Sequence, residues 1–130
     1  MTSFGMQKRL QATYDEALIR VPEALKVEGF GVLTEIDIQS TLKQKIGVDF
    51  RRYKIIGACN PPLAHEALQT DLEVGLMLPC NVVVYEGDDQ KAVVMAIDPT
   101  ITMASSGNVK LVALAEKVKE KLARALALLE

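Results

Sequence analysis

The sequence predicts one α+β domain over residues 1–130, with about five strands in a mixed or antiparallel sheet and helices packed largely on one face. Segments with the two-residue period of a strand alternate with segments of helical period, in the order β-α-β-α-β-α-β-β-α. No linker, low-complexity stretch or charge run divides the chain, and its length is typical of one domain.

The first strand and the first helix are predicted from alternation and capping. Apolar and polar side chains alternate over residues 4–10, as in a strand. Thr13 and Glu16 have the spacing of a capping box, which predicts a helix over residues 13–28. Pro22 lies inside this segment, so we expect a kink or two shorter helices.

The middle of the chain predicts two more strands with a short helix between them. Residues 30–39 alternate as a strand with one buried face. A helix is expected over residues 40–46, capped by Ser40 and ended by Gly47. Residues 53–58 are apolar on both faces apart from one lysine, which predicts a strand covered on both sides.

Asn60 and Pro61 predict the start of the third helix, which we expect to continue to about residue 68. An apolar loop is expected over residues 75–79. Residues 81–86 and 91–97 then predict a hairpin, because both are rich in β-formers and a Gly-Asp-Asp turn joins them.

The C-terminal part predicts a loop followed by a helix of about twenty residues capped by Asn108. Apolar residues at helical spacing form one stripe along it: Leu111, Leu114, Val118, Leu122 and Leu126.

Composition excludes several classes of function. With 15 basic and 17 acidic residues and a net charge of −2, the chain has no electrostatic footprint for nucleic acid or an anionic membrane surface. The N-terminus has no apolar signal-peptide core, and no apolar run reaches the roughly 18 residues of a membrane span. We therefore expect a soluble cytoplasmic protein whose two cysteines are free thiols.

The candidate ligand-binding residues surround two Cys-Asn pairs at strand boundaries. Cys59 and Asn60 precede a helix, whose N-terminal field would lower the thiol pKa, and Cys80 and Asn81 begin a strand. His65 lies about one turn into this helix, so a cluster of Cys59, His65 and Cys80 is geometrically possible, and His65 is a further candidate. Asp37, at the end of the second strand, and Asp98 are the best-placed carboxylates, although Asp98 before proline is typical of a turn.

The residues assign no metal, cofactor or reaction. Structural zinc sites use short Cys-x-x-Cys or His-x-x-x-His spacings, which are absent, although a scattered three-ligand site with Glu66 or Glu73 remains open. Nucleotide-binding glycine loops and hydrolase motifs are also absent. Whether the chain is an enzyme stays open. Met77, Met95 and Met103 are interpreted as core filler or loop contacts.

Three sequence blocks, in order, are together similar to the domain of unknown function 302 family: residues 29–37, 56–61 and 75–82. Their motif positions are Gly29, Phe30, Gly31, Asp37, Gly57, Cys59, Asn60, Pro61, Gly75, Pro79, Cys80 and Asn81. The resemblance covers nearly the whole chain. It implies a compact α+β fold that tends to form homodimers, and it implies no activity.

Three functions therefore remain open. The two Cys-Asn loops form the walls of a small-molecule pocket, or Cys59 and Cys80 supply thiol or metal chemistry, or the motif serves folding and the packing of a homodimer. In the third case the asparagines act as helix caps and the cysteines fill space.

Overall fold

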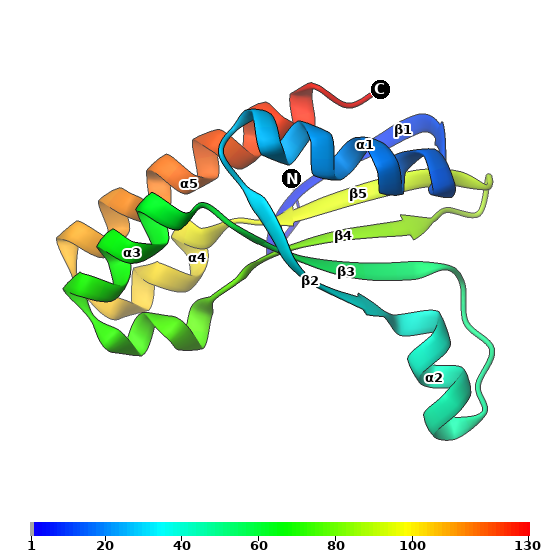
Figure 1. Cartoon of the computed structure of the whole chain (residues 1–130), viewed down its shortest axis with the longest axis horizontal. Helices are drawn as coiled ribbons and strands as arrows, with labels where there is room; N and C mark the ends of the chain where they lie inside the picture. The colour runs from blue at the N-terminus through cyan, green and yellow to red at the C-terminus, as the bar shows by residue number, and fades with distance from the viewer. Residues whose placement is uncertain (1) are drawn as a thin grey trace.

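The computed structural model describes residues 2–130 and contains a five-stranded antiparallel sheet in the order β1-β5-β4-β3-β2 (Figure 1). The strands are β1 (Gly5–Thr13), β2 (Gly31–Asp37), β3 (Tyr53–Cys59), β4 (Cys80–Glu86) and β5 (Lys91–Ile97). The α+β class and the antiparallel alternative are confirmed. The predicted hairpin is also confirmed, because β4 and β5 pair in antiparallel register from Val82 with Ala96 to Glu86 with Ala92.

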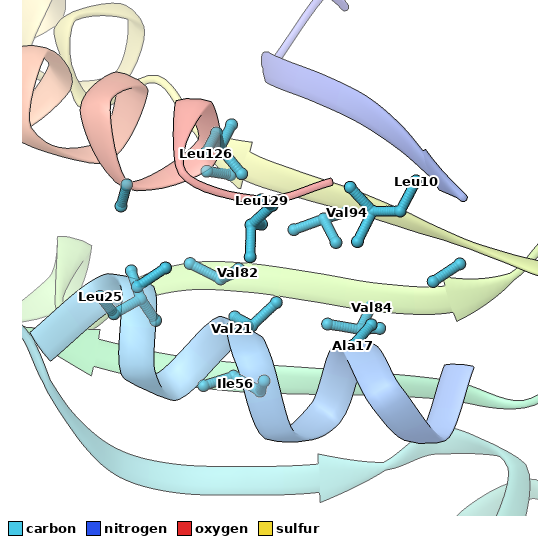
Figure 2. Close-up of a cluster of buried hydrophobic side chains, with 14 of the residues drawn as sticks. Leu10, Ala17, Val21, Leu25, Ile56, Val82, Val84, Val94, Leu126 and Leu129 are labelled. Carbon is cyan, nitrogen blue, oxygen red and sulfur yellow. The ribbon is translucent and has the colours of Figure 1, made fainter. Parts of the chain in front are cut away.

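Two long helices, α1 (Tyr14–Val27) and α5 (Val109–Ala127), lie along one face of the sheet. Figure 2 shows side chains from both helices meeting the inward side chains of the strands. The members of this core include Ala17, Val21, Leu25, Ile56, Val82, Val84, Val94, Leu122 and Leu126. The predicted packing of helices on one face is therefore confirmed. Of the stripe along the last helix, Leu122 and Leu126 pack in this core, whereas Leu111 and Leu114 pack in a smaller one.

The predicted caps are present. Thr13 and Glu16 form the capping box of α1, and Asn108 caps α5 through the amides of Lys110 and Leu111. Gly29 has the left-handed φ of 86° expected just beyond a helix. The division into two helices at Pro22 is wrong, because α1 is one helix. Buried side chains on both sides of Pro22, including Ala17, Val21 and Leu25, belong to the same core and support one continuous helix.

The predicted buried face of the second strand is wrong. β2 is an edge strand in which only Val32 is half-buried and the other residues are exposed. The helix that follows, α2 (Ile38–Ile46), begins two residues before Ser40, because Asp37 accepts the hydrogen bond from the Ser40 amide and is the cap. Gly47 ends it as predicted. No α2 residue is buried, and the helix projects beyond the sheet (Figure 1).

The prediction that the third strand is covered on both faces is also wrong. Ile56 and Ala58 face the helices and are fully buried, whereas Tyr53 and Ile55 are only half-buried on the other face, which carries no long helix. We call this surface the open face and define it by one apolar and aromatic set: Ile36, Phe50, Tyr53, Ile55, Val83, Tyr85 and Met95.

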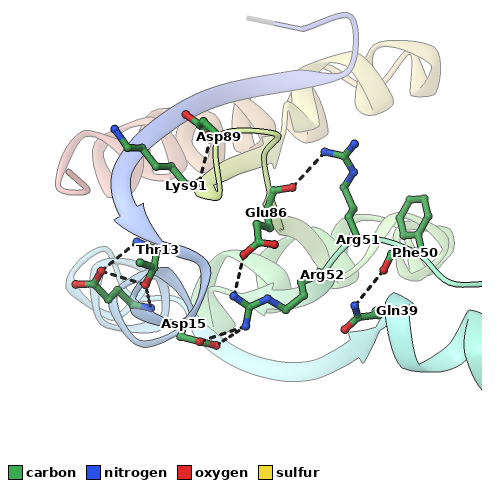
Figure 3. A network of polar contacts seen from close by, with 10 residues as sticks. Thr13, Asp15, Gln39, Phe50, Arg51, Arg52, Glu86, Asp89 and Lys91 are labelled. Carbon is green, nitrogen blue, oxygen red and sulfur yellow. Dashed lines mark hydrogen bonds and ion pairs between the residues drawn. The ribbon is translucent and has the colours of Figure 1, made fainter.

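Arg52, just before β3, ties three parts of the fold together (Figure 3). Its guanidinium donates to Asp15 of α1 at 3.1 Å and to Glu86 of β4 at 2.8 Å. The same group lies 4.7 Å from the ring centroid of Tyr14, a cation–π distance. These contacts hold the start of α1 near the start of β3 and the end of β4.

A second, smaller core lies at the opposite end of the sheet from α2. It packs α3 (Pro61–Thr70) and α4 (Pro99–Met103) against the first half of α5. The predicted loop over residues 75–79 is in part a 3-10 helix, Leu72–Met77, and the loop after residue 98 contains α4 and a 3-10 turn, Ala104–Ser106. Local apolar contacts within this core order both segments.

Candidate functional site

A cavity of about 50 Å³ lies where the two predicted loops meet the smaller core. Its walls come from the ends of β3 and β4, from α3, from the Leu72–Met77 helix and from α4 and α5. Apart from Asn60, the side chains that line it carry no nitrogen or oxygen. The chemistry of this site is therefore that of carbon and sulfur.

Four sulfur-containing side chains line the cavity, and we call it the sulfur-lined cavity: Cys59, Met77, Cys80 and Met103. Cys59 ends β3 and Cys80 begins β4, and the antiparallel register that pairs Ala58 with Cys80 brings the two cysteines to one end of the sheet. Met103 is buried on α4, whereas Met77 is 40% exposed and stands near the surface. Both cysteines are free thiols, as predicted.

Asn60 is the one polar side chain at the cavity, and both its amide oxygen and its amide nitrogen have hydrogen-bond partners. Its Oδ1 accepts from the Leu63 amide at 3.4 Å, so it caps α3 as predicted. Its Nδ2 donates to the Glu28 carbonyl at the end of α1, at 3.2 Å. The side chain joins two helices, and Gly29 leaves the room for it, since a Cβ there would lie 3.0 Å from Nδ2.

Burial controls the ionisation of both thiols. It raises the pKa of Cys80 to about 11, with a smaller contribution from Cys59, and it also raises the pKa of Cys59. The expected lowering of the Cys59 pKa by the helix terminus is wrong. Asn60 occupies the capping position and takes the Leu63 amide, so the helix end points at an amide oxygen and not at the thiol. Both thiols are protonated at neutral pH.

The remaining candidate residues lie outside the cavity. Asn81 is exposed in an adjoining groove, which it shares with Leu76, Pro79 and Thr102. His65 is exposed on α3. Asp37 pairs with Lys54 in the sheet register, whereas Gly31 at the other end of β2 pairs with Cys59, so the strand length separates Asp37 from the thiols.

Asp98 has a structural partner. It is 2% exposed, and its carboxylate lies 2.9 Å from Nζ of Lys119 on α5. It also accepts from the Thr100 hydroxyl and amide, which makes it the cap of α4. Its hydrogen bonds to Thr100 and Lys119 outweigh the effect of burial and lower its pKa. The predicted turn-forming role is present, and the carboxylate is held by neighbours on two helices.

Sequence reasoning found the two cysteines and Asn60 but missed Met77 and Met103 as a pair. These methionines are far apart in the sequence, and only the packing of the Leu72–Met77 helix beside α4 brings them to one cavity. Over residues 2–130, no group of three or more His, Cys, Asp or Glu side chains is arranged to hold a metal ion. In the same part of the chain, no helix has the length and apolar character of a membrane span.

Comparison with known proteins adds a family and a fold. Residues 6–129 match the family model described as Domain of unknown function DUF302. A crystal structure of an uncharacterized conserved protein DUF302 from Bacillus stearothermophilus superposes with a TM-score of 0.91 at 30% identity. The match covers 99% of this chain and 100% of that chain. No protein with curated annotation matches the sequence.

Proposed function

This chain belongs to the DUF302 family, and we propose that it binds a small ligand in the sulfur-lined cavity. The observation that carries the proposal is the position of the cavity, between the Cys59-Asn60 helix start and the Leu78-Pro79-Cys80 strand start. Both blocks were identified from the sequence as the walls of a site. The free thiols fit the reducing cytoplasm, where we propose that the protein acts.

The size of the cavity limits the ligand. Pockets for drug-sized molecules enclose roughly 300–1,000 Å³, and this cavity has about 50 Å³. Leaving such a void empty costs on the order of 1 kcal/mol, at about 24 cal/mol per Å³. A small apolar or sulfur-binding ligand would recover these lost contacts, whereas a polar molecule would meet almost no hydrogen-bonding partners.

Methionine methyl signals test this proposal. We expect a small apolar probe such as xenon, added to protein with 13C-labelled methionine methyls, to shift the NMR signals of Met77 and Met103. Met95, on the open face, is the internal control and should not move. Ala64→Val, which adds two methyl groups to the cavity wall, should prevent the shifts, and Ala123→Val on the exposed side of α5 should not.

Two outcomes of this experiment would count against a binding cavity. One is a Met77 and Met103 signal that no compound moves. The other is a shift that persists unchanged in Ala64→Val, because the compound would then sit elsewhere.

The open face supports a second proposal, a homodimer in which two copies pack through this surface. Tyr53 and Tyr85 stack on it with ring centroids 5.8 Å apart, and Phe50 lies 6.1 Å from Tyr53. Arg51 covers Tyr85 at 5.9 Å. Aromatic residues, methionine and arginine are the residue types enriched in protein interfaces.

The area of the open face suits a self-associating surface. Four of the strands have seven residues each. A five-stranded sheet of that length presents roughly 550 Å² at the usual strand spacing and rise. A stable interface needs about 800 Å² from each partner. The projecting α2, which ends at the exposed Ile46, and the exposed Val48 and Phe50 that follow it are placed to supply the difference.

Sedimentation or light scattering tests the dimer with one pair of variants. Ile36, on the open face, is 46% exposed and Ile19, on α1, is 66% exposed. A lysine at either position reaches water in the single chain, so neither change should prevent folding. We expect Ile36→Lys to give monomers and Ile19→Lys to leave dimers. A monomeric unmodified protein, or a dimer that Ile36→Lys does not weaken, would contradict the proposal.

A further inference from the structure

We propose that the ligand of the sulfur-lined cavity is a soft monovalent metal ion of the Cu(I) type, held by Cys59, Cys80, Met77 and Met103. This inference rests on the proposed binding function of the cavity and names its ligand class. The four side chains come from four different segments of the chain, and only the tertiary fold brings them together.

The donor set selects the metal. Thiolate and thioether sulfurs are soft ligands that favour Cu(I), whereas hard cations such as Mg²⁺ and Ca²⁺ require oxygen ligands. The usual protein ligands of zinc are thiolate, imidazole and carboxylate. No histidine or carboxylate lines the cavity, and two of its four sulfurs are thioethers.

Composition makes the convergence informative. The chain has five methionines and two cysteines in 130 residues, and four of these seven sulfur side chains line one cavity of about 50 Å³. Met95 lies on the opposite side of the sheet and Met6 in the larger core, so methionine is not confined to this end of the protein.

Volume and charge agree with a single monovalent ion. The cavity is too small for most organic ligands but has room for one ion among flexible sulfur side chains. One thiolate offsets one positive charge, so a Cu(I) ion with one thiolate, one neutral thiol and two thioethers leaves the apolar cavity without net charge. Net charge in such surroundings is strongly disfavoured.

Met77 provides a route of entry. It is 40% exposed, and it lines both the cavity and the adjoining surface groove that contains Leu76, Pro79 and Asn81. A thioether at the surface can therefore bind an incoming ion first and pass it inward to the half-buried thiols.

Binding releases a proton. A protonated thiol, RSH, reacts with Cu⁺ to give RS–Cu and H⁺, which leaves to solvent, and no oxidant or reductant is needed. Both cysteines are free thiols, and a metal binds the deprotonated sulfur. The affinity should therefore fall as the pH is lowered, and about one proton should be released for each ion bound.

The experiment is an anaerobic titration of the full chain with Cu(I) ions against a chromogenic chelator of known affinity. We expect one ion per chain, an ultraviolet absorption band from sulfur-to-copper charge transfer, and proton release in weakly buffered solution. Cys59→Ser with Cys80→Ser should abolish all three signals. Met77→Leu and Met103→Leu should each weaken binding by at least roughly 10-fold. Losing even a residue that only hydrogen-bonds a metal ligand weakens metal binding by roughly 10–100-fold.

Met95→Leu is the matched control and should bind like the unmodified protein. Far-UV circular dichroism shows whether each variant is folded, and a misfolded double cysteine variant is replaced by Cys59→Ala with Cys80→Ala. Retention of Cu(I) by a folded double variant, loss of binding in Met95→Leu, or Zn²⁺ binding as tight as Cu(I) would overturn the inference.

The metal proposal and the cavity proposal fail in different ways. If Cu(I) does not bind but xenon shifts the Met77 and Met103 signals, the cavity is a binding site and only the metal assignment is wrong. If neither probe reaches these methionines, both proposals are wrong.

Discussion

The side chain of Asn60 makes two hydrogen bonds that connect the start of α3 with the end of α1. We expect Asn60→Ala to lower the free energy of unfolding by about 0.5–2 kcal/mol, the usual cost of a lost helix cap. Urea denaturation measures this change. Asn81→Ala is the control, since Asn81 is exposed and no hydrogen bond from its side chain is present among the described residues, so its change should stay within about 0.5 kcal/mol. Equal losses in the two variants would show that Asn60 is not the connecting group.

Asp98 should make stability depend on pH. Its hydrogen bonds to Thr100 and Lys119 hold its pKa below the usual value of an aspartate, so its ionised form is favoured in the folded protein. The stabilisation is complete above the unfolded pKa and is lost as pH falls through the folded pKa. Asp98→Asn keeps an oxygen for the Thr100 amide but removes the charge beside Lys119. We expect a loss of about 1.5–3 kcal/mol near neutral pH.

The pH series distinguishes this ion pair from a general loss of packing. Denaturation of both proteins at several pH values should show the difference between them shrinking below about pH 4, the unperturbed range of an aspartate. A difference that stays constant down to the lowest pH would mean that the charge of Asp98 does not contribute.

The single residues that sequence predicts best are those whose partner is close in the chain. Asn60 as a cap depends on the amide three residues later, and Thr13 depends on Glu16. Cys59 and Cys80 were identified because they lie beside such local signals. Met77 and Met103 carry no local signal, since their contact depends on how two short helices pack.

The segment from β2 to α2 shows why some boundaries and burial patterns were wrong. Alternation in β2 has the same period whether the strand faces a core or solvent, so it predicts a strand but not what covers it. Asp37 and Ser40 are both good capping residues, and the register of β2 with β3 ends the strand at Asp37. Capping chemistry alone therefore placed the helix start too late.

α2 is also where the single chain is least stabilised. It has nine residues and none is buried, whereas isolated helices shorter than about 12–15 residues are marginal in water. We expect its amides to exchange with deuterium much faster than those of α5 in dilute protein, and to become more protected as concentration rises, because dimer formation would cover them. Hydrogen exchange at two protein concentrations measures this.

Ile36→Lys provides the control for that exchange experiment. In this variant the protection of α2 should be low at both concentrations, while the protection of α5, which packs within the chain, should be unchanged. Protection of α2 that does not depend on concentration would mean that its helix is stabilised without a second copy.

The uncovered apolar face links the stability of the domain to its assembly. If two copies share this face, the folded dimer is more stable than the folded monomer, so unfolding of the dimer also separates the chains and depends on concentration by mass action. For an assembly of this size we expect Tm to rise by roughly 3–5 °C for each tenfold increase in protein concentration.

Scanning calorimetry over two decades of concentration tests the shift. Ile36→Lys should unfold at a lower Tm that no longer depends on concentration, and Ile19→Lys should keep the dependence. A concentration-independent Tm for the unmodified protein would leave the open face to a different partner, and it would leave the sulfur-lined cavity, which lies on another part of the fold, unaffected.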